Sequence, residues 1–268
     1  MSAVNETLGL DQAPETGFSP AELEHFAREG FVVCRGLAPV PLAERMLEVA
    51  RQQLAEAVPP VEFEAELHYP GAPPSLDAEG GRTIRRLLRA QSRDFVFTQW
   101  VSHPLLRTRM AQLLGRPLVM PLAHHNCIMT KQPRYSSDTG WHQDTRYWAF
   151  ETGELANAWL ALGPEREQNG CMRVIPGSHR LELEDRRFDA ARFLREDLPE
   201  NRPLLDQQRI VELEPGDVLF FHARLLHAAT RNRSAQTKYS VVFTFRNAAN
   251  RPRPGTRSSS LPELLFAD

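Results

Sequence analysis

The second half of the chain reads as a series of short apolar segments separated by turn residues, and this pattern restricts the folds open to it. Pro-Gly pairs at 176–177 and 215–216 mark two of the turns. Many short strands with such turns are typical of a β-sandwich or a β-barrel. The segments with strand character are 118–129, 156–162, 171–175, 210–213, 218–221 and 239–245. We therefore expect a β-core in this half of the chain.

The first part of the chain carries helix signals instead. Ser19, Pro20 and Glu22 form a helix start, with an N-cap serine, a proline in the first turn and a glutamate three residues after the cap. Gly30 is expected to end this helix. Further elements are expected as helices over 41–57, 82–90 and 104–114, a strand over 31–34 and a long Pro- and Gly-rich connection over 58–80. Long connections of this kind often cover a functional site.

Together these signals predict an α+β protein with one domain over residues 18–250. The domain is expected to be helical to about residue 115 and to have its β-core from about residue 116. Residues 1–17 are expected to be a flexible N-terminus and residues 251–268 an irregular C-terminal tail. The charged segment 184–196 is expected to be an inserted helix on the surface.

The composition excludes several classes of protein. A net charge of −2 gives no general attraction to nucleic acid or to an anionic membrane. The three cysteines lack paired spacing, which argues against a disulfide framework and fits a reducing cytosol. No apolar run is long enough to span a bilayer. We therefore expect a cytoplasmic protein without a nucleic-acid or membrane partner, and the sequence makes no prediction about its oligomeric state.

The motif His142-Gln143-Asp144 is the strongest indication of chemistry. On an extended backbone His142 and Asp144 point to the same side, where an imidazole nitrogen and a carboxylate oxygen can bind one metal ion. A second histidine would complete the 2-His-1-carboxylate facial triad of non-haem Fe(II) oxygenases. His222 and His227 are both candidates, and their spacing alone does not choose between them.

Several blocks of the chain, in this order, resemble the phytanoyl-CoA dioxygenase family of Fe(II)/2-oxoglutarate-dependent oxygenases. The blocks are Glu29-Gly30-Phe31-Val32-Val33, Trp141-His142-Gln143-Asp144 with Tyr147, Asn169-Gly170-Cys171, Ile175-Pro176-Gly177-Ser178-His179, Pro215-Gly216-Asp217, His227 and Asn232-Arg233-Ser234. The resemblance covers roughly residues 20–246. It implies a double-stranded β-helix (jelly roll) core with packed N-terminal and inserted helices. Because the family's distal histidine lies shortly before an Asn-x-Ser, it also implies His142, Asp144 and His227 as the Fe(II) ligands.

The same resemblance implies 2-oxoglutarate as co-substrate and O2 as oxidant. The family usually places an arginine about eleven residues after the distal histidine to bind the 5-carboxylate of 2-oxoglutarate. This chain has Lys238 there, which offers a point charge in place of a planar fork, and Arg246 is the alternative. By resemblance, Asn126 and Gln143 are candidate polar contacts of the co-substrate and Trp159 is a candidate wall of its site.

The expected reaction is hydroxylation of a small-molecule metabolite or natural product, with release of succinate and CO2. Asp144 argues against a halogenase, because a small residue in its place would free a metal position for halide. Three alternatives are weighed against it. Two stay open: a cupin-like metal enzyme that does not use 2-oxoglutarate, and a catalytically silent module that binds a metal or ligand. The third, a nucleic-acid demethylase, is disfavoured by the balanced charge and the lack of a basic stripe.

Two further clusters are weighed against ordinary structural roles. His124 and His125 are adjacent, so on a strand they would face opposite sides and would not bind one ion together. The arginines at 82, 85, 86 and 89 would share one face of the expected helix, which is more typical of a solvated surface than of a phosphate site.

Overall fold

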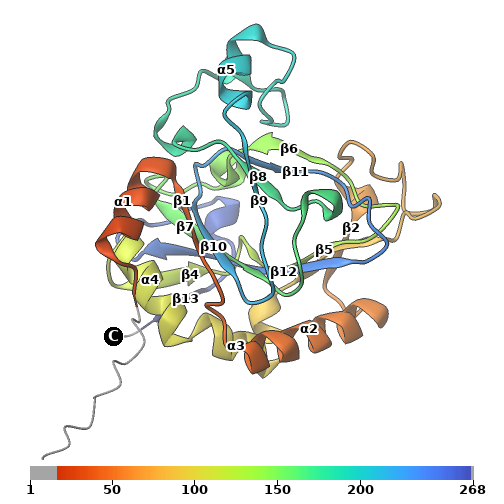
Figure 1. Ribbon diagram of the computed structural model, residues 1–268, viewed down its shortest axis with the longest axis horizontal. Coiled ribbons are helices and arrows are strands. Elements are labelled where there is room, and N and C mark those ends of the chain that lie inside the picture. The colour runs from red at the N-terminus through yellow and green to blue at the C-terminus, as the bar shows by residue number, and fades with distance from the viewer. Residues whose placement is uncertain (1–16, 267–268) are drawn as a thin grey trace, which may run out of the picture.

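The computed structural model describes residues 17–266, which form two antiparallel sheets with helices packed against one of them (Figure 1). The larger sheet has the order β1-β10-β7-β12-β5-β3-β2, and β4 pairs with both β12 and β13. The smaller sheet has the order β6-β11-β8-β9. The expected flexible N-terminus lies outside the described residues apart from residue 17.

The strands are short except for β12, which is the central strand of the larger sheet. The larger sheet contains β1 (Phe31–Cys34), β2 (Val61–Phe63), β3 (Ile84–Leu88), β4 (Leu118–Pro121), β5 (Asn126–Lys131), β7 (Leu155–Ala161), β10 (Val218–His222), β12 (Lys238–Asn247) and β13 (Glu263–Phe266). The smaller sheet contains β6 (Thr139–His142), β8 (Met172–Val174), β9 (Arg209–Val211) and β11 (His227–Ala229).

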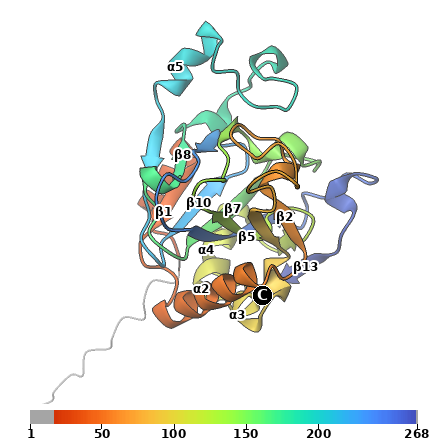
Figure 2. The same ribbon diagram turned by 90° about the vertical axis from the view of Figure 1, so that its right-hand side faces the viewer.

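Residues 17–266 contain five α-helices: α1 (Pro20–Glu29), α2 (Val40–Ala55), α3 (Phe95–Val101), α4 (Pro104–Leu114) and α5 (Arg202–Leu205). The helices α2, α3 and α4 lie along the outer face of the larger sheet, α1 lies beside β1 at its edge, and α5 lies at the far side of the smaller sheet (Figures 1 and 2). The helix α1 begins and ends as expected. Ser19 and Glu22 form a capping box, and Gly30 ends the helix with a φ of 82°.

Two apolar layers result from the alternation of side chains along the strands of the larger sheet. One face, which includes Leu160, Val241 and Phe243, packs against the helices. The opposite face, which includes Trp159 and Phe221, packs against the smaller sheet. The metal centre described below lies between the two sheets, where both backbones are held by cross-strand hydrogen bonds.

Three expectations about local structure were wrong. Residues 84–88 form the strand β3, because they pair with β2 on one side and β5 on the other, and this pairing overrides the helical preference of Arg and Leu. The segment 184–196 contains one turn of 3-10 helix, Asp185–Arg187, and a bridge between Phe188 and Leu194 in place of an α-helix. The C-terminal tail is not irregular throughout, since β13 pairs with β4.

The expected division into a helical part and a β-core does not separate two regions in space. The strands β1, β2 and β3 come from the part expected to be helical, and they join the same sheet as β5, β7, β10 and β12. The three cysteines are free and buried. Among the described helices, none combines the length and apolar character that crossing a membrane requires.

Candidate metal centre

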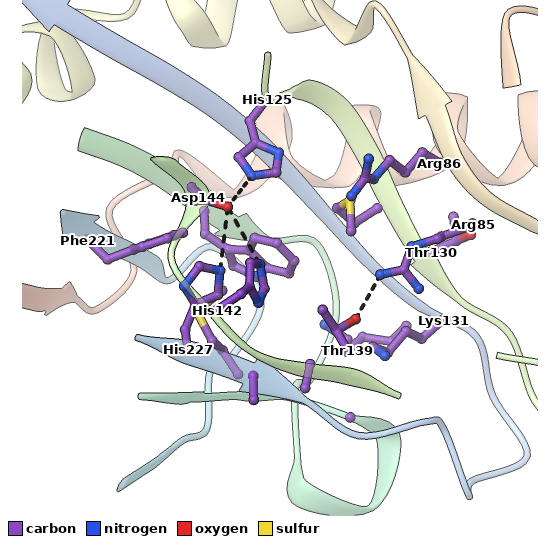
Figure 3. A pocket seen from close by; sticks show the side chains of 17 residues that line it. Arg85, Arg86, His125, Thr130, Lys131, Thr139, His142, Asp144, Phe221 and His227 are labelled. Atoms are coloured by element: carbon purple, nitrogen blue, oxygen red, sulfur yellow. Dashed lines mark hydrogen bonds and ion pairs between the residues drawn. The ribbon is translucent and has the colours of Figure 1, made fainter. Parts of the chain in front are cut away.

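Two histidines and one aspartate converge in the space between the sheets. His142 ends β6 and His227 begins β11, and the two residues are direct partners in the antiparallel register. Asp144 follows two residues after His142, at the start of the 3-10 helix Asp144–Tyr147. One ligand atom from each residue lies within 4.8 Å of the others (Figure 3). Of the two candidate histidines, His222 and His227, it is therefore His227 that lies together with His142 and Asp144.

Both imidazoles are oriented so that Nε2 faces the common centre. The Nδ1 atoms of His142 and His227 donate to the carbonyl oxygens of Gly140 at 2.8 Å and Leu225 at 2.9 Å. Each Nε2 lies 3.7 Å from Asp144 Oδ1. Burial lowers the pKa of both histidines, so they are neutral and have a free Nε2 lone pair. This is the form of histidine that binds a metal ion.

The Asp144 carboxylate is held by two residues that sequence reasoning did not identify as its partners. His125 Nε2 donates to Asp144 Oδ1 at 2.9 Å, and Asn157 Nδ2 donates to Oδ2 at 2.7 Å. Asn157 is itself fixed by Thr244, whose hydroxyl donates to its side-chain oxygen. Burial acts to raise the pKa of Asp144, but the charge of His125 and its hydrogen bond to the carboxylate act in the opposite direction, and the pKa of Asp144 lies below its usual range. The carboxylate is thus ionised and fixed in orientation.

Replacing Asn157 with leucine is expected to weaken metal binding by about 10- to 100-fold, because the outer partners of a metal ligand orient it. Leucine has a similar shape but cannot donate to Asp144 Oδ2. A titration with Fe(II) under anaerobic conditions would measure the affinity. Asn126→Leu is the matched control, since Asn126 bonds to Gln91 outside the site and should keep the wild-type affinity. Equal affinities in the two variants would contradict this role of Asn157.

The cavity beside the three ligands has a volume of about 60 Å³ and is called the inner cavity. Lys238 and Trp159, two of the residues proposed from the resemblance, line this cavity. Asn126 and Gln143 do not: the first bonds to Gln91, and the second donates to the Arg224 carbonyl oxygen at 2.7 Å. Their positions therefore give no support to the expected contacts with the co-substrate.

Arg246, the alternative to Lys238, lies near the other end of β12. Its guanidinium forms an ion pair with Glu263 and donates to the carbonyl oxygens of Asn247 and Ala248. It does not line the inner cavity. His222, the alternative metal ligand, is also outside the cavity, with its Nε2 at 3.4 Å from Glu154 Oε2. Neither alternative residue therefore lines the inner cavity.

Lys238 has a carboxylate partner that the sequence did not indicate. Its Nζ lies 2.9 Å from Oε2 of Glu165, which is fully buried and also accepts from Trp159 Nε1 at 2.8 Å and from the Ser240 hydroxyl. Lys238 itself is only 4% exposed. The charge of Lys238 is therefore already balanced by the protein.

A second buried lysine lies next to Lys238. Lys131 on β5 lies directly opposite Lys238 on β12 in the antiparallel register, and it also lines the inner cavity. Lys131 Nζ donates to the Ser137 carbonyl oxygen at 2.9 Å, and no carboxylate of the described residues lies at salt-bridge distance from it. Burial, followed by the charges of Arg85 and Lys238, lowers the pKa of Lys131 well below its ordinary value. The two lysines and Glu165 together leave one positive charge unbalanced when both ammonium groups are protonated.

Gly170, in the Asn-Gly-Cys block of the sequence, shapes the same end of the inner cavity. Its φ is 77°, and a Cβ there would lie 2.2 Å from the Thr230 carbonyl oxygen and 2.8 Å from Lys131 Cδ. Only glycine fits this conformation and this close approach. The block therefore keeps space for the Lys131 side chain.

A second cavity, of about 190 Å³, reaches the metal centre from the protein surface and is called the outer cavity. It shares Arg86, His125, Thr139, His142 and Asp144 with the inner cavity. Its remaining lining comes from the strands β2, β3 and β5, the turn before β5, the connection after β2, the turn after Asp144 and the C-terminal tail. These residues are Glu62, Leu67, Tyr69, Leu88, His124, Cys127, Arg146, Tyr147, Trp148 and Arg257. The long connection expected to cover a site therefore does line one.

The two adjacent histidines face different surroundings, although they lie in a turn and not on a strand. While His125 bonds to Asp144, His124 Nε2 lies 2.8 Å from the Ser258 hydroxyl and its ring lies against Trp148 at 4.8 Å. Burial, with a further contribution from Arg257, lowers the pKa of His124 to about 3.

The depressed pKa of His124 predicts an acid-dependent loss of stability. An unfolded histidine titrates near pH 6.5. The stabilisation from the neutral ring is therefore fully present above about pH 6.5 and is lost as the pH falls from there towards about 3. We expect Tm to fall on acidification through this window, and to fall less in His124→Gln. The exposed His68 gives the control His68→Gln, which should follow the wild type. A pH profile of His124→Gln identical to that of the wild type would contradict the expectation.

Fold and site together define a class: an antiparallel β-protein with a buried 2-His-1-carboxylate centre for one metal ion. A sequence model described as Phytanoyl-CoA dioxygenase (PhyH) matches residues 26–240. The chain therefore belongs to the phytanoyl-CoA dioxygenase family.

Individual relatives are distant. A probable phytanoyl-CoA dioxygenase of Caenorhabditis elegans is 27% identical over 165 residues, which cover 58% of this chain and 52% of the relative. An L-proline trans-4-hydroxylase of Streptomyces griseoviridis is 25% identical over 197 residues, covering 65% and 71%. Among solved structures, the non-haem alpha-ketoglutarate-dependent epimerase SnoN from nogalamycin biosynthesis superposes with a TM-score of 0.70 at 25% identity, covering 88% and 87%. The matched stretch spans about half the length of the nematode relative.

Proposed function

We propose that this protein is a non-haem Fe(II)- and 2-oxoglutarate-dependent dioxygenase that hydroxylates a small-molecule metabolite or natural product. The observation that carries the proposal is the buried His142–Asp144–His227 centre, which adjoins a cavity lined by Lys131, a lysine without a carboxylate partner among the described residues. Three protein ligands on one side of an ion leave positions for a chelating co-substrate and for O2. One relative is named as an L-proline trans-4-hydroxylase, and SnoN is named as a non-haem alpha-ketoglutarate-dependent epimerase.

The donor set fits Fe(II). Two neutral imidazoles and one carboxylate give two nitrogen ligands and one oxygen ligand, the set used by Fe(II) oxygenases. When bound, Fe(II) with 2-oxoglutarate and O2 would supply the oxidising chemistry, with succinate and CO2 as by-products. The protein contributes the orientation of the ligands through Gly140, Leu225 and Asn157, and a site shielded from water.

2-Oxoglutarate is a dicarboxylate, and the charges of the inner cavity fit it. Its 1-carboxylate would join the metal, and its 5-carboxylate would be held by Lys131 together with Lys238. Since Glu165 already balances one of these lysines, one further carboxylate makes the group neutral. A neutral buried group is far less costly than one with an unpaired charge. Trp159 and Gly170 would form part of the wall around the co-substrate.

We further propose that the two facing sheets are the halves of a double-stranded β-helix. Three features support this description: all strand pairs are antiparallel, many neighbouring strands are far apart in the chain, and His142 and His227 come from β6 and β11 of the smaller sheet. A cytoplasmic location is also proposed, and the three free, buried cysteines support it.

One observation favours a second candidate. Lys238 is already paired with Glu165, so its charge does not require a carboxylate from a co-substrate. The cavity is therefore also compatible with a cupin-like metal enzyme that does not use 2-oxoglutarate. The two candidates differ in one measurable property, the binding of 2-oxoglutarate to the metal.

The experiment is the anaerobic addition of Fe(II) and then 2-oxoglutarate, with the visible metal-to-ligand charge-transfer band as the readout. We expect the band in the wild type and its loss in His142→Ala. Fe(II) binding without a band would favour the cupin-like candidate. An unchanged band in His142→Ala would show that the chelate forms elsewhere, and the proposal would fail.

A further inference from the structure

The outer cavity is the space left for a substrate if the inner cavity holds the co-substrate. The two cavities meet at His142 and Asp144, while His227 and both lysines line only the inner one. A molecule in the outer cavity would therefore approach the metal from the His142–Asp144 side. With about 190 Å³, this cavity is smaller than the roughly 300 Å³ at which sites for drug-sized ligands begin. The space fits a small molecule, or one part of a larger one.

Positive charge dominates the lining of this cavity. It contains three arginines, and its carboxylates are Glu62 and the metal ligand Asp144. Arg86 is balanced by Glu62, with 3.3 Å between Nη1 and Oε1. Within residues 17–266, neither Arg146 nor Arg257 has a carboxylate at salt-bridge distance. Two cationic groups in the lining thus have no anionic partner from the described protein.

Arg146 is held in one orientation. Its Nη2 donates to the Tyr69 hydroxyl at 2.7 Å, and its guanidinium lies 4.1 Å from the Phe193 ring centre and 4.6 Å from that of Tyr147. Arg146 lines the same cavity as His142 and Asp144, so it lies beside the metal centre. A guanidinium fixed between aromatic rings is suited to the two-point binding of an oxyanion.

The remaining walls are aromatic and largely uncharged. Tyr69, Tyr147 and Trp148 line the cavity, and Trp148 lies edge-to-face against His125 at 5.3 Å. His124 is neutral at physiological pH because its pKa is about 3, so it adds no positive charge. Flat rings accommodate a flat apolar body with little loss of side-chain freedom.

From these observations we propose that the substrate is a small organic acid, with an aromatic or otherwise planar body between the aromatic walls and its oxyanion bound by Arg146 and Arg257. The inference rests on the proposed function for the position of the metal and the co-substrate. A carboxylate and a phosphate share this chemistry, and the carboxylate is the smaller group for a cavity of this size.

The test measures ligand binding by calorimetry, separately from turnover. The probes are phenylacetate and 3-phenylpropanoate, their neutral amides, and phenyl phosphate. They are titrated into the anaerobic protein with Fe(II) and 2-oxoglutarate, and again into the metal-free protein. We expect at least one acid to bind about tenfold or more tightly than its amide, the size of effect that a charged hydrogen bond contributes.

The variant Arg146→Gln/Arg257→Gln should lose this preference for the acid. Arg82→Gln/Arg89→Gln removes the same charge from two exposed positions that line neither cavity, so it should keep the preference. Circular dichroism and Tm establish that both variants are folded. Tighter binding of phenyl phosphate that also depends on Arg146 and Arg257 would support the oxyanion site and assign it to phosphate esters.

Three outcomes would overturn the inference. Amides that bind as tightly as their acids would show that the negative charge of the ligand does not contribute to binding. A preference for acids that survives in Arg146→Gln/Arg257→Gln would show that these two arginines do not bind the oxyanion. If the affinity for 2-oxoglutarate, measured from the charge-transfer band, falls in that variant while the affinities for the probes do not change, the arginines would be assigned to the co-substrate. The presence of the charge-transfer band in the wild type tests the proposed function, and the comparison of acid and amide tests the substrate class.

Discussion

Replacing His227 with alanine is expected to abolish the charge-transfer band of the Fe(II)–2-oxoglutarate complex and the release of succinate. The variant would retain only His142 and Asp144, and two ligands do not hold a chelated ion in place. His222→Ala is the matched control, because this histidine is equally buried and lies five residues earlier in the chain. It bonds to Glu154 outside the inner cavity, so its removal should leave the band unchanged.

The measurement is a titration of each variant with Fe(II) and 2-oxoglutarate under anaerobic conditions, followed by visible absorption. A Tm for each protein separates loss of the metal from loss of the fold. A band that persists in His227→Ala, or one that vanishes in a folded His222→Ala, would mean that the wrong histidine has been assigned to the metal.

The two lysines of the inner cavity are expected to respond differently to replacement by methionine. Lys131→Met removes the unbalanced charge, so the affinity for 2-oxoglutarate should fall by about 10- to 100-fold while the fold is largely retained. Lys238→Met leaves the fully buried Glu165 without its cation. Breaking a buried ion pair in this way costs about 3–5 kcal/mol of unfolding free energy, so this variant should be markedly less stable.

Both effects can be measured on the same preparations. Chemical denaturation gives the free energy of unfolding, and the charge-transfer band gives the affinity for 2-oxoglutarate. Lys238→Met/Glu165→Gln serves as the control, since it removes the pair together and should recover part of the stability. Equal losses of stability in the two single variants would contradict the charge balance described for this cavity.

Local signals in the sequence predicted those elements whose ends are fixed by their own residues. The helix α1 is bounded by its capping box and by Gly30, and the strand β1 has the predicted bounds. The segment 84–88 failed because its conformation depends on pairing with β2 and β5, which are distant in the chain. Local preference carries no information about such partners.

The candidate site shows the same division. His142 and Asp144 could be proposed from their spacing, and resemblance to the family selected His227. The partner of Lys238 could not be foreseen, because Glu165 reaches it only through the packing of the sheets. Asn157 did leave a signal, a polar residue inside the apolar strand β7, and buried polar groups of this kind usually have a specific partner.

The excursion between β8 and β9 links the two sides of the site. Its Phe193 ring lies edge-to-face against His142 at 5.8 Å, and its Leu194 amide donates to the carbonyl oxygen of Trp141 at 2.7 Å. That same excursion supplies Phe193 and the Ala191 carbonyl oxygen, which contact Arg146 at the outer cavity. A change in this one surface segment is therefore expected to alter the environment of a ligand histidine and the lining of the outer cavity together.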